Sequence, residues 1–135
     1  MTTIPPKDVT VLLRIDGFAV AVAAIAAYAL LGGNWWIFAL LILAPDLSML
    51  GGLAGPVIGA KAYNLAHSYF VPVVIGLVAW FAGATWLVPY LLIWVAHIAI
   101  DRALGFGLKY PGSFNETHLG IIGKPGKEAP LANAR

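Results

Sequence analysis

The chain has 135 residues, of which 61% are hydrophobic and only 10% are charged. Soluble domains carry about 25% charged residues, so this composition argues against a water-soluble globule. The formal net charge of +2 is small, which argues against nucleic acid as a partner. The absence of cysteine excludes disulfides, thiolate metal ligands and cysteine nucleophiles.

Two long stretches, 17–45 and 62–100, contain no Asp, Glu, Lys or Arg. Apolar runs of this length are typical of helices that cross a lipid bilayer. Turn signals such as Gly32-Gly33-Asn34 divide them. We therefore predict an all-α polytopic membrane protein, an up-down bundle of four transmembrane helices within residues 1–110. The predicted helices are 9–31, 35–50, 56–81 and 85–104.

Two prolines are expected to disturb these helices, because proline removes a backbone donor and clashes with the preceding turn. Pro45 lies near the end of the second helix, so we expect irregular backbone around Asp46. Pro72 lies inside the third helix, where we expect a bend. The tryptophans are interpreted as residues of the membrane interface.

Small residues indicate where helices approach closely. Gly51, Gly55 and Gly59 are spaced by four, a pattern that lets two helix backbones come together in lipid. We predict that this face could also join two copies of the chain in a homo-oligomer. The other predicted partner of the protein is the lipid bilayer.

The arrangement of positive charge predicts the orientation. In the predicted bundle every Lys and Arg falls on one side: Lys7, Arg14, Lys61, Arg102, Lys109, Lys124, Lys127 and Arg135. By the positive-inside rule, both termini are expected in the cytoplasm. Residues 111–123 carry many specific side chains and are predicted to form an ordered, lid-like cytoplasmic segment, whereas 124–135 are predicted to be a flexible tail.

Polar residues of the predicted helices lie at similar depths. At about 1.5 Å of rise per residue, all of them fall in the cytoplasmic half of the bundle. His97 and Asp101 are four residues apart on one helical face, and Asn64 and His67 are three apart on another. Ionisable groups are costly in lipid, so this grouping indicates a functional pocket. Its predicted walls are Asp16, Asp46, Asn64, His67, His97 and Asp101.

Two imidazoles with carboxylates are typical ligands of a divalent metal ion, here Zn, Fe or Mn. We predict that His67, His97 and Asp101 hold the metal and that Asp46 or Asp16 completes the site. The catalytic candidates are Asp46, Asp16 and His118, which could serve as base or acid. The candidate supporting residues are Asn64, Tyr63 and Arg102, which would orient the ligands.

Structural interpretations of single residues stay open. Asp16 could pair with Arg14 or Lys61, and Asp101 with Arg102 or Arg14, as ion pairs without chemistry. Asp46 could cap a broken helical segment, and a histidine could simply bond a backbone carbonyl.

Several strings of residues resemble a known family. They are Leu43–Leu50 (LAPDLSML), Tyr63–Tyr69 (YNLAHSY), Trp94–Arg102 (WVAHIAIDR), Gly105–Tyr110 (GFGLKY) and Phe114–Gly120 (FNETHLG). Together they resemble domain-of-unknown-function family 4260, small bacterial integral membrane proteins, over about residues 12–123. The resemblance implies a multi-pass protein of the inner (plasma) membrane and no activity. Where the family more often has Glu before the glycine of the first helix, this chain has Asp16. A looser likeness, through His67-Ser68 and His97…Asp101, is to bacterial inner-membrane proteins regarded as metal-dependent hydrolases.

Our leading hypothesis is a metal-dependent membrane enzyme, a hydrolase acting on a lipid-like or amphiphilic substrate. One alternative is an oligomeric subunit of a transporter or channel, in which the same residues conduct protons or ions. Another is a structural or assembly partner that uses the glycine face.

Overall fold

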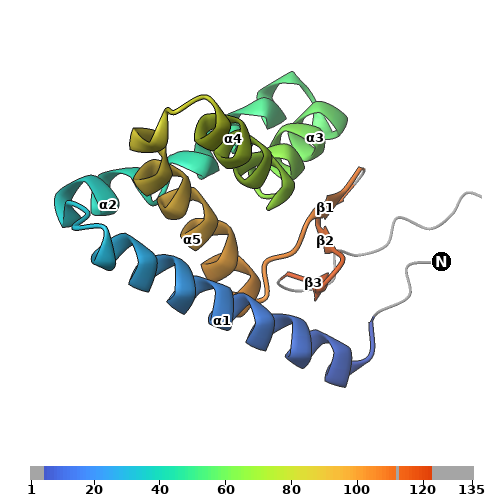
Figure 1. Ribbon diagram of the computed structural model, residues 1–135. Helices are drawn as coiled ribbons and strands as arrows, with labels where there is room; N and C mark the ends of the chain where they lie inside the picture. The colour runs from blue at the N-terminus through green and yellow to red at the C-terminus, as the bar shows by residue number, and fades with distance from the viewer. Residues whose placement is uncertain (1–4, 112, 123–135) are drawn as a thin grey trace, which may run out of the picture.

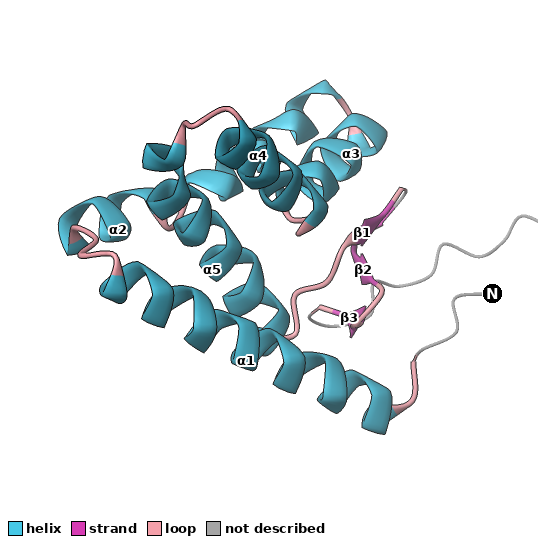
Figure 2. Ribbon diagram, viewed as in Figure 1, coloured by secondary structure: helices cyan, strands magenta, loops and turns pink. Residues whose placement is uncertain are grey.

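The computed structural model describes residues 5–111 and 113–122, so the predicted tail 124–135 lies outside the described residues. The described chain is mainly helical, with one small sheet (Figure 2). Its helical elements are α1 (Lys7–Leu30), α2 (Trp35–Leu41), η1 (Ala44–Ala54), α3 (Pro56–Ala66), α4 (Phe70–Phe81), η2 (Thr85–Leu87) and α5 (Val88–Leu104). Its strands are β1 (Lys109–Tyr110), β2 (Ser113–Thr117) and β3 (Gly120–Ile121).

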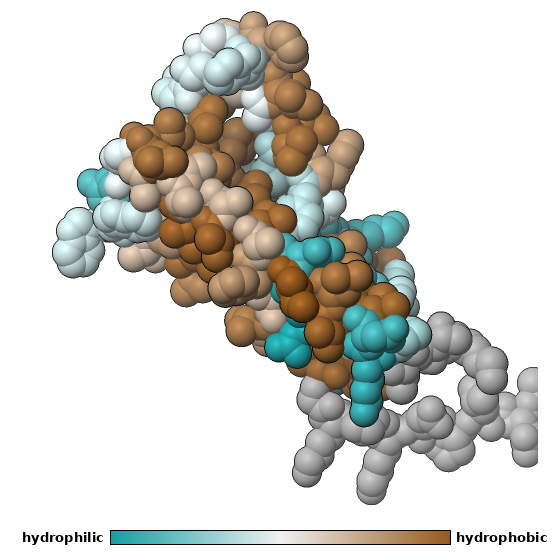
Figure 3. All heavy atoms as spheres, turned by 60° about the horizontal axis from the view of Figure 1, so that its bottom comes forward, coloured by the Kyte–Doolittle hydropathy of each residue, from teal (hydrophilic) through white to brown (hydrophobic). Residues whose placement is uncertain are grey.

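Within the described residues, three helical segments are long and apolar enough to cross a membrane: Lys7–Leu30, Trp35–Ala54 and Thr85–Leu104. Helices α3 and α4 reach that length only together, and their axes differ by 46°. The chain therefore offers three spans, or four if the bent pair is one span. Large apolar side chains are exposed on every one of these segments, and hydrophilic residues gather towards one end of the face in Figure 3. This surface suits lipid better than water.

The second predicted helix changes character at Pro45, as expected. Helix α2 is capped by the Asn34 side chain, which accepts hydrogen bonds from the backbone N–H groups of Trp36 and Ile37. After Leu41 the chain tightens into the 3-10 helix η1, with Pro45 in its first turn. Asp46 thus lies on irregular backbone, and the prediction is confirmed.

The third predicted helix is broken at residues 67–69, so the prediction of a bend at Pro72 itself was wrong. The proline ring would clash with the carbonyl four residues earlier, that of Ser68. The chain avoids this clash by ending α3 at Ala66 and starting α4 at Phe70. Pro72 then lies in the first turn of α4, where a missing N–H costs little. The break turns His67 towards α5.

Helices α1 and α5 cross in close contact at a glycine (Figure 1). Gly17 of α1 is buried, and a Cβ atom there would lie only 2.6 Å from the Cβ of Arg102. No side chain fits in that space, so this contact needs glycine. The same contact fixes α1 beside the end of α5 that carries Asp101 and Arg102.

The spaced glycines serve a second close contact, between η1 and α3. A Cβ at Gly51 would lie 2.9 Å from the Cβ of Ala62, and one at Gly59 would lie 2.7 Å from the Cα of Gly52. The backbones of the two helices therefore meet inside one chain. Association of two copies through this face stays a prediction.

The sheet lies beside the end of α5 and next to α3 (Figure 1). Its strands are antiparallel in the order β1-β2-β3. Asn64 of α3 binds β1 through both ends of its amide, donating to the Lys109 carbonyl and accepting from the Lys109 N–H, each at 2.7 Å. The ordered segment after the last helix is therefore a small sheet tied to α3, an element that we did not predict.

Candidate metal centre

Four predicted residues from three elements converge on one point. Asp46 lies on η1, His67 is the C-terminal cap of α3, and His97 and Asp101 lie one turn apart on α5. One ligand atom from each residue can be chosen so that all four lie within 4.8 Å of one another. The tertiary fold thus brings together residues that are up to 55 positions apart in sequence, from 46 to 101.

The distances in this cluster resemble the edges of a tetrahedron. The Nε2 atoms of His67 and His97 are 3.1 Å apart. The Asp46 Oδ1 atom lies 3.2 and 3.3 Å from these two nitrogens, and the Asp101 Oδ2 atom lies 3.4 Å from each. Ligands at about 2.0–2.1 Å from a tetrahedral metal ion are about 3.3–3.4 Å apart. These five distances are therefore compatible with ligation of one such ion.

The two histidine rings turn their Nε2 atoms towards each other. The Nδ1 of His67 lies 2.9 Å from the Tyr63 carbonyl, to which it donates. In its neutral form the His67 ring then presents an unprotonated Nε2 to the cluster. Two imidazole nitrogens and two carboxylate oxygens meet there, so either a bound cation or protons on the rings must offset the charge of the carboxylates.

The cluster is closed on the histidine side and open at Asp46. The side chain of His67 is 0% exposed and that of His97 is 5% exposed, whereas that of Asp46 is 40% exposed and that of Asp101 is 17% exposed. A ligand could therefore approach the cluster past Asp46.

In the described part of the chain, Asp101 does not form an ion pair with Arg102 or Arg14. Both guanidinium groups donate to backbone carbonyls instead.

Side chains of α5 stabilise the break that positions His67. The Trp94 Nε1–H donates to the Ala66 carbonyl at 2.6 Å. Arg102 donates from Nη2 to the His67 carbonyl at 2.7 Å and from Nη1 to the Phe106 carbonyl at 2.8 Å. The bonds from Trp94 to the Ala66 carbonyl and from Arg102 to the His67 carbonyl satisfy groups that would otherwise lack a partner at the end of α3.

Tyr63 packs against the His67 ring of the cluster. Its ring stacks on that of His67, with centroids 3.8 Å apart and an interplanar angle of 13°. The Lys109 Nζ lies 4.3 Å from the centroid of the Tyr63 ring, in a cation–π contact. Burial lowers the pKa of the Lys109 amine, while the carboxylates of Asp46 and Asp101 act in the opposite direction. Lys109 is therefore a buried residue whose amine packs against the ring that stacks on His67.

Asp16 and His118 are not brought into the cluster. Asp16 is exposed on α1, and both residues line a separate cavity of about 380 Å³ that also includes Ser68, Tyr69 and Arg102. His118 Nδ1 accepts a hydrogen bond from the Leu108 N–H at 2.8 Å. Burial and the Arg102 guanidinium lower the pKa of His118. The catalytic roles assigned to these two residues stay predictions.

Two supporting residues were missed by sequence reasoning. Trp94 was interpreted as interfacial, and Lys109 as a residue of the cytoplasmic side. Trp94 has a signal that could have been used, because it lies three residues before His97 and thus on the same helical face. Lys109 gave no such signal, because its position depends on the docking of the sheet.

Comparison with family models gives one match, described as "Domain of unknown function (DUF4260)", over residues 10–122. The match covers most of the chain, so the protein belongs to this family. A search of curated proteins and a search of solved structures each return no match.

Proposed function

We propose that this member of domain-of-unknown-function family 4260 is a metal-dependent membrane enzyme. His67, His97 and Asp101 hold a divalent ion, with Zn, Fe and Mn as candidates, and Asp46 completes the site. The observation that supports this proposal is the convergence of two imidazole nitrogens and two carboxylate oxygens, at 3.1–3.4 Å for the five contacts above. Such a set would repel itself in the membrane unless a bound cation or protons on the rings were present.

Hydrolysis is the reaction that the donor set favours. A divalent ion in such a site lowers the pKa of bound water and polarises a carbonyl or phosphoryl oxygen. Asp46 is the residue best placed to leave the ion and accept a proton, because it is the most exposed of the four and lies on the 3-10 helix. The supporting residues Tyr63, Arg102 and Asn64 keep His67 and the sheet in place.

The membrane arrangement is part of the proposal. Four segments run up-down-up-down through the inner (plasma) membrane, with the bent pair α3–α4 as one span and both termini in the cytoplasm. The cluster then lies near the cytoplasmic interface, where the headgroup of an amphiphile meets its chain. A lipid-like or amphiphilic substrate follows from this depth.

Metal analysis tests the proposal directly. Protein purified without chelator should contain about one Zn, Fe or Mn per chain, and His97→Ala should lose most of it because one of four ligands is gone. Asp16→Asn is the matched control, since Asp16 lies outside the cluster, and should keep the metal. Metal-free wild-type protein, or metal that survives His97→Ala, would remove the basis of the proposal.

The same acceptor cluster favours one second function, proton or ion conduction. Protons on the two histidines could neutralise the carboxylates in place of a metal ion. In that case proteoliposomes should show a proton flux that disappears in Asp46→Asn, and the purified protein should lack metal. Flux without metal would select conduction, and metal without flux would select the enzyme.

A further inference from the structure

An apolar cavity of about 330 Å³ lies next to the candidate metal centre. Three of its lining residues are neighbours of the metal-binding cluster in sequence or on one helical face. Pro45 precedes Asp46, Ala66 precedes His67, and Ile93 lies one turn before His97 on α5. The cavity thus shares η1, α3 and α5 with the cluster, and α2 adds Leu41 to its wall.

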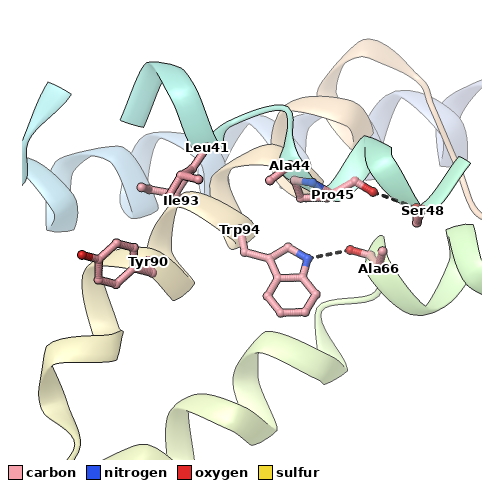
Figure 4. A pocket seen from close by; sticks show the side chains of 8 residues that line it. All are labelled: Leu41, Ala44, Pro45, Ser48, Ala66, Tyr90, Ile93 and Trp94. Carbon is pink, nitrogen blue, oxygen red and sulfur yellow. Dashed lines mark hydrogen bonds between the residues drawn. The ribbon is translucent and has the colours of Figure 1, made fainter. Parts of the chain in front are cut away.

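Two polar side chains in the cavity wall, Trp94 and Ser48, are already bonded to the protein itself. The Trp94 N–H donates to the Ala66 carbonyl, and the Ser48 hydroxyl donates to the Pro45 carbonyl at 2.7 Å (Figure 4). The hydroxyl of Tyr90 points away from Trp94 in the same view. The wall therefore offers carbon atoms and the face of an indole to an occupant. A polar or charged ligand would gain no partner here.

Along α5 the residues of the cavity, the cluster and the polar end of the site follow one another in order. Tyr90, Ile93 and Trp94 line the cavity, His97 and Asp101 follow at the cluster, and Arg102 and the sheet come next. Apolar space thus lies on one side of the cluster, and the buried cation Lys109 with its sheet lies on the other. An amphiphile whose reacting bond lies at the cluster would extend its chain into the cavity.

We propose that this cavity is the subsite for a single alkyl chain of an amphiphilic substrate. Its volume has room for roughly ten methylene-sized groups, at about 30 Å³ for each group of the size of water. That is enough for one medium-length chain and too little for the two chains of a diacyl lipid. The inference rests on the proposed function for the identity of the substrate, but chain binding itself needs no metal.

Photolabelling of the full chain in phosphatidylcholine nanodiscs tests the subsite. The probe is decanoic acid with a diazirine in its chain, and labelled residues are identified by mass spectrometry. We expect labelling of Ile93 and Trp94 to exceed that of exposed apolar residues of α1, such as Phe18, by at least about fivefold, or about 1 kcal/mol of binding free energy. Unlabelled decanoic acid should compete for the cavity labels only.

Blocking variants sharpen this test. Ala66→Phe and Ala44→Phe each place a ring in the cavity and should abolish the enrichment, whereas Ala19→Phe on the exposed face of α1 should leave it unchanged. Two variants are used because a substitution next to His67 could disturb the fold, and metal content of the same samples reports on the fold near the cluster. Even labelling over all exposed apolar residues, or enrichment that survives both blocking variants, overturns the subsite.

The two proposals can fail separately. Blocked labelling in Ala44→Phe with wild-type protein that contains no metal would support the chain subsite and reject only the metal-dependent function. Uniform labelling in protein that contains metal would reject only the subsite.

Discussion

The turn at residues 67–69 separates two groups of polar side chains that look alike in sequence and differ in space. On one side, Asp46, His67, His97 and Asp101 converge within 4.8 Å. On the other, Asp16 and His118 line a cavity of about 380 Å³ with Arg102. Both groups combine carboxylate and imidazole, yet only the first directs its acceptor atoms at one point.

The difference between the two groups lies in what each imidazole does with its second nitrogen. His67 is bonded to the backbone through Nδ1, and its Nε2 faces that of His97 at 3.1 Å, where a cation could be shared. His118 instead uses Nδ1 to accept the Leu108 N–H, a bond between the residue before β1 and the turn after β2. Histidine near carboxylate therefore indicates a metal site only when backbone contacts orient the rings.

The largest expected effect is on metal affinity, when one carboxylate of each group is replaced in turn by an amide. Asp101→Asn should weaken metal binding by more than about 100-fold, because it removes a charged ligand from the cluster. Asp16→Asn should change it by no more than about twofold, as expected for an exposed residue away from the site. Metal titration of the two purified variants gives both values. Equal losses would show that the two groups act as one site.

A smaller loss of metal affinity is expected for substitution of Arg102, which contacts both groups. Arg102 holds the His67 carbonyl and also lines the cavity with Asp16. Arg102→Met keeps much of the side-chain volume but leaves that carbonyl without its donor, so metal affinity should fall by about 10–100-fold. The direction of change should be the same in Trp94→Phe, which removes the donor to the Ala66 carbonyl.

Ser48→Ala is a suitable control for these two variants, because the Ser48 hydroxyl bonds the Pro45 carbonyl and touches no ligand. Unchanged metal affinity in both Arg102→Met and Trp94→Phe would mean that the break holds His67 without help from α5.

The membrane character, the helical class and the group of candidate ligands could all be predicted from the sequence. Long uncharged stretches need lipid, and His97 and Asp101 share a helical face whatever the fold around them. Depth along the helices also grouped His67 with Asp46, because rise per residue is nearly constant.

Two features could not be predicted, because they depend on how helices rotate and pack. Depth put Asp16 at the level of the cluster, but the contact of Gly17 with Arg102 turns Asp16 to an exposed face. The position of the break depended on which carbonyls α5 could satisfy, and Trp94 and Arg102 lie about 28 and 35 residues from their acceptors.

The smallest expected effect is a pH dependence of the docking of the sheet, which involves His118 of the second group and not the metal-binding cluster. The pKa of His118 is lowered in the folded protein by burial and by Arg102, so the undocked sheet binds a proton more readily than the docked one. Docking is then complete above the ordinary histidine pKa of about 6.5 and weakens as pH falls below it, by at most about 1.4 kcal/mol per pH unit. The Leu108 bond contributes to this loss, because a proton on Nδ1 removes its acceptor.

A spin label can follow this docking, since the chain has no cysteine of its own. Ile121→Cys on β3 is exposed and gives a single attachment site. With His118 present, label mobility should rise as pH falls from 7.5 to 5. In the His118→Gln background mobility should change little, because the docking free energy should vary by only about 0.5 kcal/mol or less over that range. Mobility that rises equally in both backgrounds would assign the effect to other groups. Metal content should stay constant above pH 6.5 in both, because His118 lies outside the cluster of Asp46, His67, His97 and Asp101.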